Sequence, residues 1–376
     1  MSGMEIPFID LGAMHRGLSV ELDDAWARIR RTDAFIGGEA VERFEAEWAD
    51  YCATDHCVGI ANGTAAIELT LKAMDIGPGD EVIVPANTFI ATAEAVMAAG
   101  ARPVFVDVDP ATLLMTAEGV QAMITGRTAA VVVVHLYGQP ADMDALGAVA
   151  RAAGIAIIED AAQAHGATWN GKPAGSQSDA GCFSFYPGKN LGAFGDAGAV
   201  VTRDAALARR IRMLSNHGRP AGTPHLHEMV GGTNRLDALQ AAILSIKLKR
   251  LDAWNAGREH AMRLYQKALR DMPVEFVRTA PGARSCHHLA VIQVDRRDDL
   301  RRSLAAADIA TGIHYPIPCH RQRPFLDERA PPLPVTERAA HRILSLPMYP
   351  HLTEEQVKHV AEAIGRAMAE PEMKRR

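Results

Sequence analysis

Short aliphatic runs alternate with longer segments of helical periodicity over most of the chain. The runs show no period of two, which is typical of strands covered by helices on both faces. The alternation predicts an α/β fold with a mainly parallel central sheet and right-handed crossovers. We expect strands at His56–Ala61, Glu81–Pro85, Pro103–Val106, Ala129–His135, Ile155–Glu159 and Gly181–Tyr186, and helices at 62–74, Ile90–Ala99, Ala117–Ile124, Met143–Ala153 and Ala205–Leu214.

The pattern differs at the two ends of the chain. Before the first strand, residues Asp23–Ala49 have helical spacing in two pieces, with a break near 32–38. A long amphipathic helix is expected from about Arg235 to Arg258. The C-terminal part then mixes helices at His260–Arg270, Leu300–Ala307 and Glu354–Met368 with a strand at Cys286–Val294 and a Pro-rich connection at Tyr315–Pro334. We therefore expect a large α/β domain at residues 1–255 and a smaller α+β domain at 256–376.

Composition narrows the class of protein. The 376 residues are 48% hydrophobic and 23% charged, the balance of a soluble enzyme with a substantial core. A net charge of -5 without a long basic run argues against a nucleic-acid partner. No apolar run approaches the ~20 residues that span a bilayer, and residues 1–16 lack the pattern of a secretory signal. We expect a cytoplasmic protein with no membrane partner.

The number and spacing of the cysteines also favour the cytoplasm, and they do not indicate a metal site. The five cysteines are odd in number and lack CxxC spacing, so a disulfide framework is not expected. Cys286, His287 and His288 are consecutive, but neighbouring residues of a strand point to opposite faces. We interpret them as a partly buried thiol and two unrelated histidines, and predict no metal.

One lysine is a candidate for covalent chemistry. The apolar run Gly181–Tyr186 leads into Pro187-Gly188-Lys189-Asn190, which places Lys189 among turn residues at the end of a strand. Burial there would favour the neutral amine, the form that attacks a carbonyl to make a Schiff base. A lysine beside glycines is more often an ordinary solvated loop residue, so this motif needs support from the rest of the chain.

A carboxylate follows another predicted strand. Asp160 comes directly after Ile155–Glu159, at the edge of the sheet where ligands bind. A buried carboxylate needs a cation or a nitrogen that it can keep protonated. Capping the next helix is the alternative role. Gln163 and His165 follow closely and could reach the same pocket.

Other residues at this edge suggest a phosphate and a flat ring. Gly63-Thr64-Ala65 opens a helix after a strand, where free N–H groups and the helix dipole attract anions, and Ser184 offers a second hydroxyl. Phe89 follows another strand and could cover a flat ligand, or it belongs to the core. An amine, a carboxylate, a phosphate site and an aromatic ring together indicate pyridoxal 5'-phosphate. No GxGxxG follows a strand and no Walker A motif occurs, so nucleotide cofactors lack support.

Over nearly its whole length the chain resembles the DegT/StrS-type sugar aminotransferases, enzymes of fold type I that use pyridoxal phosphate. The resemblance is carried by NGTAA (62–66), GPGDEV (77–82), PANTF (85–89), HLYGQPADM (135–143), EDAAQAHG (159–166), SFYPGKNLG (184–192), RLDALQAA (235–242) and SLPMYP (345–350). It implies a homodimer with shared active sites. The lysine also separates the chain from related sugar dehydratases, which carry histidine at the position of Lys189.

The resemblance implies a role for each site residue. Lys189 would be the Schiff-base lysine and Asp160 the partner of the pyridine nitrogen. Gln163 would bond the ring hydroxyl and Phe89 would stack on the ring. The phosphate would be held by Gly63, Thr64, Ala65 and Ser184, with Asn234 or Thr233 reaching it from the neighbouring subunit.

The expected substrate is a nucleotide-linked keto-sugar. The resemblance implies a dTDP-linked 3-keto- or 4-keto-6-deoxyhexose, with L-glutamate as amino donor. Tyr315 and His320 resemble substrate-side residues that contact sugar or phosphate, although a proline-stiffened interdomain link explains the segment equally well. A keto-cyclitol substrate is the enzymatic alternative. A regulator or sensor that keeps the fold without turnover is the alternative from another class.

Overall fold

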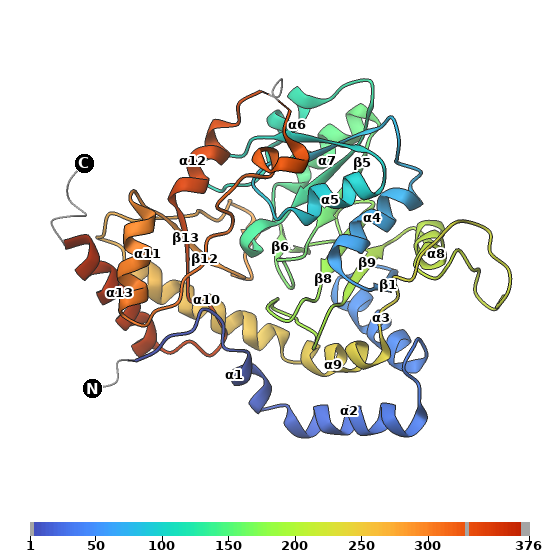
Figure 1. Ribbon diagram of the computed structural model, residues 1–376, viewed down its shortest axis with the longest axis horizontal. Coiled ribbons are helices and arrows are strands. Elements are labelled where there is room, and N and C mark those ends of the chain that lie inside the picture. The colour runs from blue at the N-terminus through green and yellow to red at the C-terminus, as the bar shows by residue number, and fades with distance from the viewer. Residues whose placement is uncertain (1–3, 328–330, 370–376) are drawn as a thin grey trace.

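A seven-stranded sheet forms the centre of the computed structural model, which describes residues 4–327 and 331–369 (Figure 1). Residues 1–3, 328–330 and 370–376 of the expected domains lie outside the described ranges. The strand order is β1-β9-β8-β5-β4-β2-β3, and β9 alone runs opposite to both of its neighbours. The sheet is therefore mainly parallel, and the predicted fold class is confirmed. Its strands are β1 (His56–Ile60), β2 (Glu81–Pro85), β3 (Arg102–Val106), β4 (Thr128–Val134), β5 (Ala156–Asp160), β8 (Ala180–Ser184) and β9 (Gly198–Thr202).

Helices cover both faces of this sheet, as the aliphatic runs predict. Neighbouring residues of one strand belong to different cores: Val132 packs with one face and Val131 with the other. The first face is covered by α4 (Gly63–Ala73), α5 (Ala91–Ala98) and α8 (Ala205–Leu214). The second is covered by α3 (Glu39–Tyr51), α6 (Ala117–Met123), α7 (Met143–Ala153) and α9 (Ala238–Leu248). Of the N-terminal helices, α2 (Ser19–Thr32) lies along α9, and α1 (Leu11–Arg16) packs through Met14 near Trp254, which follows α9 (Figure 1).

A second, smaller core lies at the C-terminal end of the chain. Three antiparallel strands, β10 (Glu275–Phe276), β12 (Ala290–Gln293) and β13 (Ile343–Leu346), pack with α10 (Leu251–Ala268), α11 (Arg297–Ala306) and α13 (Glu354–Ala369). The remaining elements connect the two parts: η1 (Leu136–Gly138), β6 (Thr168–Trp169), β7 (Lys172–Pro173), β11 (Ala283–Arg284), η2 (Cys319–Arg321), η3 (Arg323–Phe325) and α12 (Pro334–Arg342). The expected domain boundary after residue 255 falls inside α10.

The predicted long helix from 235 to 258 and the separate helix from 260 to 270 are wrong. The structure has α9 and α10 instead, with a break at Lys249 and Arg250. Leu244 of α9 and Leu251 at the start of α10 pack in the core of the large sheet, while Tyr265 further along α10 packs in the small C-terminal core. The hydrophobic pattern of a helix continues across residues 249–250, so the sequence did not indicate a break there. No helix in the described ranges is long and apolar enough to cross a membrane.

Candidate active site

A cavity of about 830 Å³ opens at the carboxyl ends of the central strands, and residues 288–289 and 314–315 line it from the C-terminal part of the chain. This volume lies in the usual range for small-molecule sites. Almost every residue expected to bind a ligand lines it: Gly63, Thr64, Ala65, Phe89, Asp160, Gln163, Ser184, Lys189, Asn234 and Tyr315. The structure thus brings together residues that lie up to 252 positions apart in the chain (Gly63 to Tyr315, 315 − 63 = 252).

Lys189 lies on a tight loop after β8. Its backbone N–H donates to the Tyr186 carbonyl at 2.8 Å, and the loop folds so closely that a Cβ on Gly192 would lie 2.3 Å from the Pro187 oxygen. Next to the lysine, the buried Asn190 donates from Nδ2 to Asn255 Oδ1 at 2.8 Å and to the Cys286 carbonyl at 3.0 Å. These bonds fix the base of the lysine against α10 and the segment before β12.

The environment of Lys189 favours its neutral form. Burial lowers the pKa of its ammonium group from 10.5 to about 8, while the negative charge of Asp160 acts in the opposite direction. A substantial fraction of free amine is therefore present in mildly alkaline solution. This amine faces the cavity, where it can attack a carbonyl or take up a proton.

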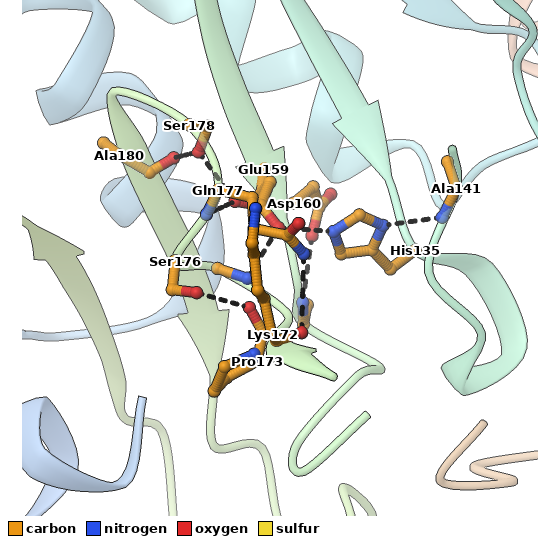
Figure 2. Close-up of polar contacts among 12 residues, drawn as sticks. His135, Ala141, Glu159, Asp160, Lys172, Pro173, Ser176, Gln177, Ser178 and Ala180 are labelled. Carbon is orange, nitrogen blue, oxygen red and sulfur yellow. Dashed lines mark hydrogen bonds and ion pairs between the residues drawn. The ribbon is translucent and has the colours of Figure 1, made fainter. Parts of the chain in front are cut away.

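The end of β5 is held by the buried carboxylate of Glu159, as Figure 2 shows. Glu159 accepts hydrogen bonds from His135 Nε2 at 2.8 Å, from the backbone N–H groups of Gly175 and Gln177 at 2.6 and 2.8 Å, and from Ser178 Oγ at 2.8 Å. The Ala141 N–H donates to His135 Nδ1 at 3.2 Å, so the imidazole proton lies on Nε2 and points at Glu159. Burial alone would raise the pKa of Glu159, but these bonds hold it below its usual value.

Asp160 is the last residue of β5 and points from the opposite face of the strand into the cavity. Its Oδ2 accepts a hydrogen bond from Thr92 Oγ1 at 2.7 Å, and its Oδ1 accepts one from the Ala162 N–H at 3.2 Å. The side chain is 8% exposed, and the second bond is a short local turn rather than a cap of the predicted helix. A buried carboxylate in this position is suited to a protonated ring nitrogen.

The N-terminus of α4 and Ser184 form the anion-binding side of the cavity. A Cβ on Gly63 would lie 2.6 Å from the Ser184 Cβ, so only glycine lets the start of the helix approach this hydroxyl. The Ala65 N–H is already bonded to the N-cap Asn62 Oδ1 at 2.8 Å. Within the described ranges no protein acceptor faces the N–H groups of Gly63 and Thr64, which leaves them for a bound anion.

Gln163 and two aromatic residues form the opposite wall. Gln163 Oε1 accepts from the Tyr137 N–H at 2.6 Å, and its Nε2 donates to the Tyr315 hydroxyl at 3.2 Å. The rings of Phe89 and Tyr315 lie 5.5 Å apart with a 40° tilt. Phe89 is 53% exposed and faces the cavity, so its predicted alternative as a plain core residue is wrong.

Two expected residues lie elsewhere. His165 is fully buried between Phe183 and Phe185, with ring centroids 5.7 and 5.5 Å away, and burial lowers its pKa to about 3. It is a neutral core residue, because the turn after β5 sends positions 163 and 165 to different sides. His320 is buried against Glu337, with Nε2 3.0 Å from Oε1, and does not line the cavity.

The structure also separates Asn234 from Thr233. Asn234 lines the cavity of its own chain, and its carbonyl accepts from the Ala61 N–H at 2.9 Å. Thr233 is exposed, and its hydroxyl lies 2.9 Å from His217 Nε2.

Several polar residues that line the cavity were not predicted from the sequence, among them Thr88, Thr92, His288 and His314. Thr88 and Thr92 follow a strand at an i, i+4 spacing, a signal that could have placed both on one side of a helix start. Burial lowers the pKa of His314 to about 4 and that of His288 far below its usual value, so both imidazoles are neutral. Nothing in the local sequence indicates that these two histidines lie beside Lys189.

The donor set fits pyridoxal 5'-phosphate. The amine of Lys189, the carboxylate of Asp160 and the open N–H groups at Gly63 and Thr64 match an aldehyde, a ring nitrogen and a phosphate, and they share one cavity. No group of three or more metal-ligating side chains occurs in the part of the chain that the structure describes. The site therefore has the groups for carbonyl and proton chemistry.

Curated relatives match almost the whole chain. It is 47% identical over 360 residues to the erythromycin biosynthesis sensory transduction protein EryC1 of Saccharopolyspora erythraea, covering 95% of this chain and 98% of that protein. It is 46% identical over 363 residues to a UDP-N-acetyl-3-dehydro-alpha-D-glucosamine 3-aminotransferase of Acidithiobacillus ferrooxidans, with 96% and 98% covered. It is also 46% identical over 363 residues to a dTDP-3-amino-3,4,6-trideoxy-alpha-D-glucose transaminase of Streptomyces venezuelae, with 96% and 95% covered.

Solved structures show the same architecture. S. venezuelae DesV in complex with a ketimine intermediate superposes with a TM-score of 0.94 at 45% identity, covering 97% of this chain and 99% of that one. NtdA from Bacillus subtilis with bound cofactor PMP gives a TM-score of 0.92 at 30% identity, covering 98% and 86%. The family model of the DegT/DnrJ/EryC1/StrS aminotransferases matches residues 18–365. The chain belongs to the DegT/DnrJ/EryC1/StrS aminotransferase family.

Proposed function

We propose that this chain is a pyridoxal-phosphate-dependent aminotransferase that places an amino group on C-3 of a nucleotide-linked keto-deoxysugar. The observation that carries the chemistry is the meeting of Lys189, Asp160 and the α4 N-terminus in one cavity. The family match supports the aminotransferase activity. The cofactor is supported by the solved NtdA structure, which contains PMP.

The residues of the cavity would divide the work of holding the cofactor. Asp160 would bind the ring nitrogen and keep it protonated, while the N–H groups of Gly63 and Thr64 and the Ser184 hydroxyl would bind the phosphate. Gln163 offers its amide to the ring hydroxyl, and Phe89 covers the ring. When bound, pyridoxal 5'-phosphate supplies an aldehyde that takes up the amino group and a ring that withdraws electrons.

Lys189 has two tasks in this arrangement. Its amine would hold the cofactor aldehyde until an amino substrate replaces it. The freed amine, with a pKa of about 8, would then take a proton from the substrate carbon and return it two atoms away, across the nitrogen, to the carbon derived from the cofactor aldehyde. A group with a pKa close to the working pH is suited to both directions of transfer.

Two relatives support the position of amination. The A. ferrooxidans protein is named for a 3-dehydro sugar linked to UDP, and the S. venezuelae protein for a 3-amino sugar linked to dTDP. Both names place the nitrogen at C-3 while the nucleotides differ. We therefore favour a 3-keto-6-deoxyhexose over the 4-keto isomer, with dTDP as carrier and L-glutamate as amino donor.

The charge of the cavity supports a homodimer. Within the described ranges, Lys189 is the only lysine or arginine that lines it, whereas Glu68, Asp160 and Asp196 are acidic. A sugar diphosphate and the carboxylates of glutamate need more positive charge than one amine provides. We infer that a second copy of the chain completes the site. All five cysteines are free and buried, as suits the cytoplasm.

A regulatory role is the alternative from another class, because EryC1 is named a sensory transduction protein. A pure sensor has no need for an amine of lowered pKa beside the cavity. A keto-cyclitol aminotransferase is the other enzymatic candidate and differs only in the second substrate.

The test uses the purified protein loaded with pyridoxal 5'-phosphate. L-glutamate should remove the near-visible absorbance and release 2-oxoglutarate, and a dTDP-3-keto-6-deoxyhexose should restore the absorbance. NMR of the product should locate the amine at C-3. If only a 4-keto sugar or a keto-cyclitol restores the absorbance, that compound replaces the 3-keto sugar as the proposed substrate. If no amino donor changes the absorbance, the result favours a sensor over an enzyme.

A further inference from the structure

Two buried threonine hydroxyls connect in series to the Asp160 carboxylate. Thr92 Oγ1 lies 2.7 Å from Asp160 Oδ2, and Thr88 Oγ1 lies 2.9 Å from Thr92 Oγ1. Thr92 is 0% exposed and Thr88 is 3% exposed, yet both border the cavity. Thr88 lies in the segment that joins β2 to α5 and Thr92 is the second residue of α5, whereas Asp160 ends β5.

The direction of both hydrogen bonds can be deduced. An ionised carboxylate only accepts, so the Thr92 hydroxyl must donate its single proton to Asp160. Thr92 can then only accept from Thr88, whose hydroxyl must be the donor at 2.9 Å. The series therefore runs Thr88 to Thr92 to Asp160, and each proton points toward the carboxylate.

Neither hydroxyl follows the usual local pattern. A threonine inside a helix commonly bonds to the carbonyl four residues before it, as Thr70 does with Ala66 at 2.8 Å in α4. For Thr92 that carbonyl belongs to Thr88 and is instead bonded to Cys319 Sγ at 3.2 Å. The N-terminus of α5 has no side-chain cap either, so Thr88 does not serve as one. Both hydroxyls are directed away from the helix backbone and toward Asp160.

From this geometry we propose that Thr92 and Thr88 are positioning residues that orient the Asp160 carboxylate toward the cofactor ring nitrogen. The donated proton fixes Oδ2, and the Ala162 N–H holds Oδ1, so rotation of the carboxylate about its last bond is restrained at both oxygens. Thr88 strengthens the bond from Thr92 by polarising its hydroxyl. This inference rests on the proposed function, since it presumes that Asp160 faces a protonated ring nitrogen.

The experiment compares four variants of the holoenzyme. Thr92→Val removes the hydroxyl at constant shape, Thr92→Ser keeps it, and Thr88→Val removes only the outer donor. Thr70→Val is the matched control, because Thr70 is a buried helical threonine that does not line the cavity. The main measurement is the ¹⁵N chemical shift of ring-labelled pyridoxal phosphate across pH, together with cofactor affinity and thermal unfolding.

We expect Thr92→Val to lose ring-nitrogen protonation at a lower pH than wild type and to lower kcat by roughly tenfold, with a smaller change in KM. Thr92→Ser should restore both properties. Thr88→Val should show a weaker effect of the same sign, and it decides the matter if Thr92→Val does not fold. Thr70→Val should change only thermal stability.

If the ¹⁵N shift depends on pH in both valine variants as it does in wild type, the inference is overturned. Asp160→Asn, measured in parallel, separates this failure from that of the proposed function. If Asp160→Asn changes the titration and the threonine variants do not, only the positioning role fails. If Asp160→Asn also leaves the titration unchanged, the assignment of Asp160 to the ring nitrogen fails.

Discussion

In the part of the chain that the structure describes, two lysines have a pKa lowered by burial to a value at which much of their charge is lost in mildly alkaline solution. Burial lowers the pKa of both Lys189 and Lys247 to about 8. Lys247 donates to the Gly192 carbonyl, lies 3.2 Å from His15 Nε2 and has the Phe194 ring 5.5 Å away. It anchors the loop that carries Lys189, whereas Lys189 itself borders the cavity. At the scale of the residue, the two amines have the same pKa, and access to the cavity distinguishes Lys189 as the candidate reactive amine.

This contrast predicts how the two amines react with a small acylating reagent. In the apo protein, labelling of Lys189 should rise with pH through a midpoint near 8, because only the neutral amine is nucleophilic. Lys247 has the same pKa but should stay protected until the protein unfolds. Mass spectrometry of peptides after timed labelling measures both. A Lys189 midpoint near 10.5, or equal labelling of the two, would contradict this account.

The same pKa shifts have a consequence for stability. The unfolded chain holds these protons up to a pKa of 10.5, so between pH 8 and 10.5 it binds more protons than the folded chain. The contribution of both lysines to the free energy of unfolding should therefore increase with pH across that window. Lys247→Met should flatten this part of the urea-denaturation profile. If the free energy of unfolding of that variant rises with pH as steeply as that of wild type, Lys247 does not contribute to the pH dependence.

Replacement of Lys189 tests its role in catalysis. Lys189→Ala should reduce transamination by at least ~10³-fold, because it removes both the nucleophile and the proton carrier. Lys247→Met should keep the chemistry once the protein is folded. Stopped-flow absorbance after addition of glutamate measures the half-reaction in each. A Lys189→Ala enzyme with near-wild-type rates would refute the assignment.

At the scale of the element, the end of β5 presents two carboxylates with opposite tasks. Asp160 faces the cavity, and Glu159 accepts hydrogen bonds from four donors that belong to two separate segments on the other side of the strand (Figure 2). Those donors join β4 and the loop at 175–178 to β5. The position of Asp160 therefore depends on how firmly Glu159 is held.

Loss of this network should be costly. Glu159→Ala leaves His135 and two backbone N–H groups without their acceptor, which should lower the free energy of unfolding by about 3–5 kcal/mol. Urea denaturation measures the change. Since the folded pKa of Glu159 lies below its usual 4.5, its contribution is present above that pH and is lost as pH falls through the depressed value. Equal acid sensitivity of wild type and variant would contradict this prediction.

Gly63 gives a second prediction at this scale. Gly63→Ala should push the α4 N-terminus away from Ser184, because the new Cβ would lie 2.6 Å from the Ser184 Cβ. Cofactor affinity should fall more than stability does. Gly126→Ala is the control, since a Cβ there meets nothing within 4 Å. Equilibrium titration with pyridoxal phosphate compares them, and equal affinities would argue against the phosphate site.

Elements with a strong local pattern could be predicted from the sequence. β2 and α7 match their expected ranges, because a short aliphatic run and a regular amphipathic stripe each permit few alternatives. β9 was not expected, because Gly198–Thr202 begins at a glycine directly after turn residues and only its pairing with β1 and β8 identifies it as a strand. The contacts of His288, Thr88 and Thr92 depend on how distant segments meet, and local periodicity contains no such information.

At the scale of the whole molecule, the cavity lies at the carboxyl ends of the central strands, and Lys189 is the only lysine or arginine of the described residues that lines it, which leaves the charge balance incomplete. If a second copy supplies the missing charge, activity should depend on association. Specific activity should fall on dilution in parallel with the dimer fraction seen by sedimentation velocity. Full activity in a sample shown to be monomeric would contradict a shared site.

The central claim is that Lys189 transfers amino groups to a sugar carbonyl, and the two half-reactions test it most directly. The protein carrying pyridoxal phosphate is mixed first with L-glutamate and then with a dTDP-linked 3-keto-6-deoxyhexose, while absorbance is followed and the product is identified by mass spectrometry and NMR. This account predicts loss and then recovery of the near-visible band, with an amine at C-3 of the sugar. A loaded wild-type protein whose spectrum no amino donor alters would contradict it.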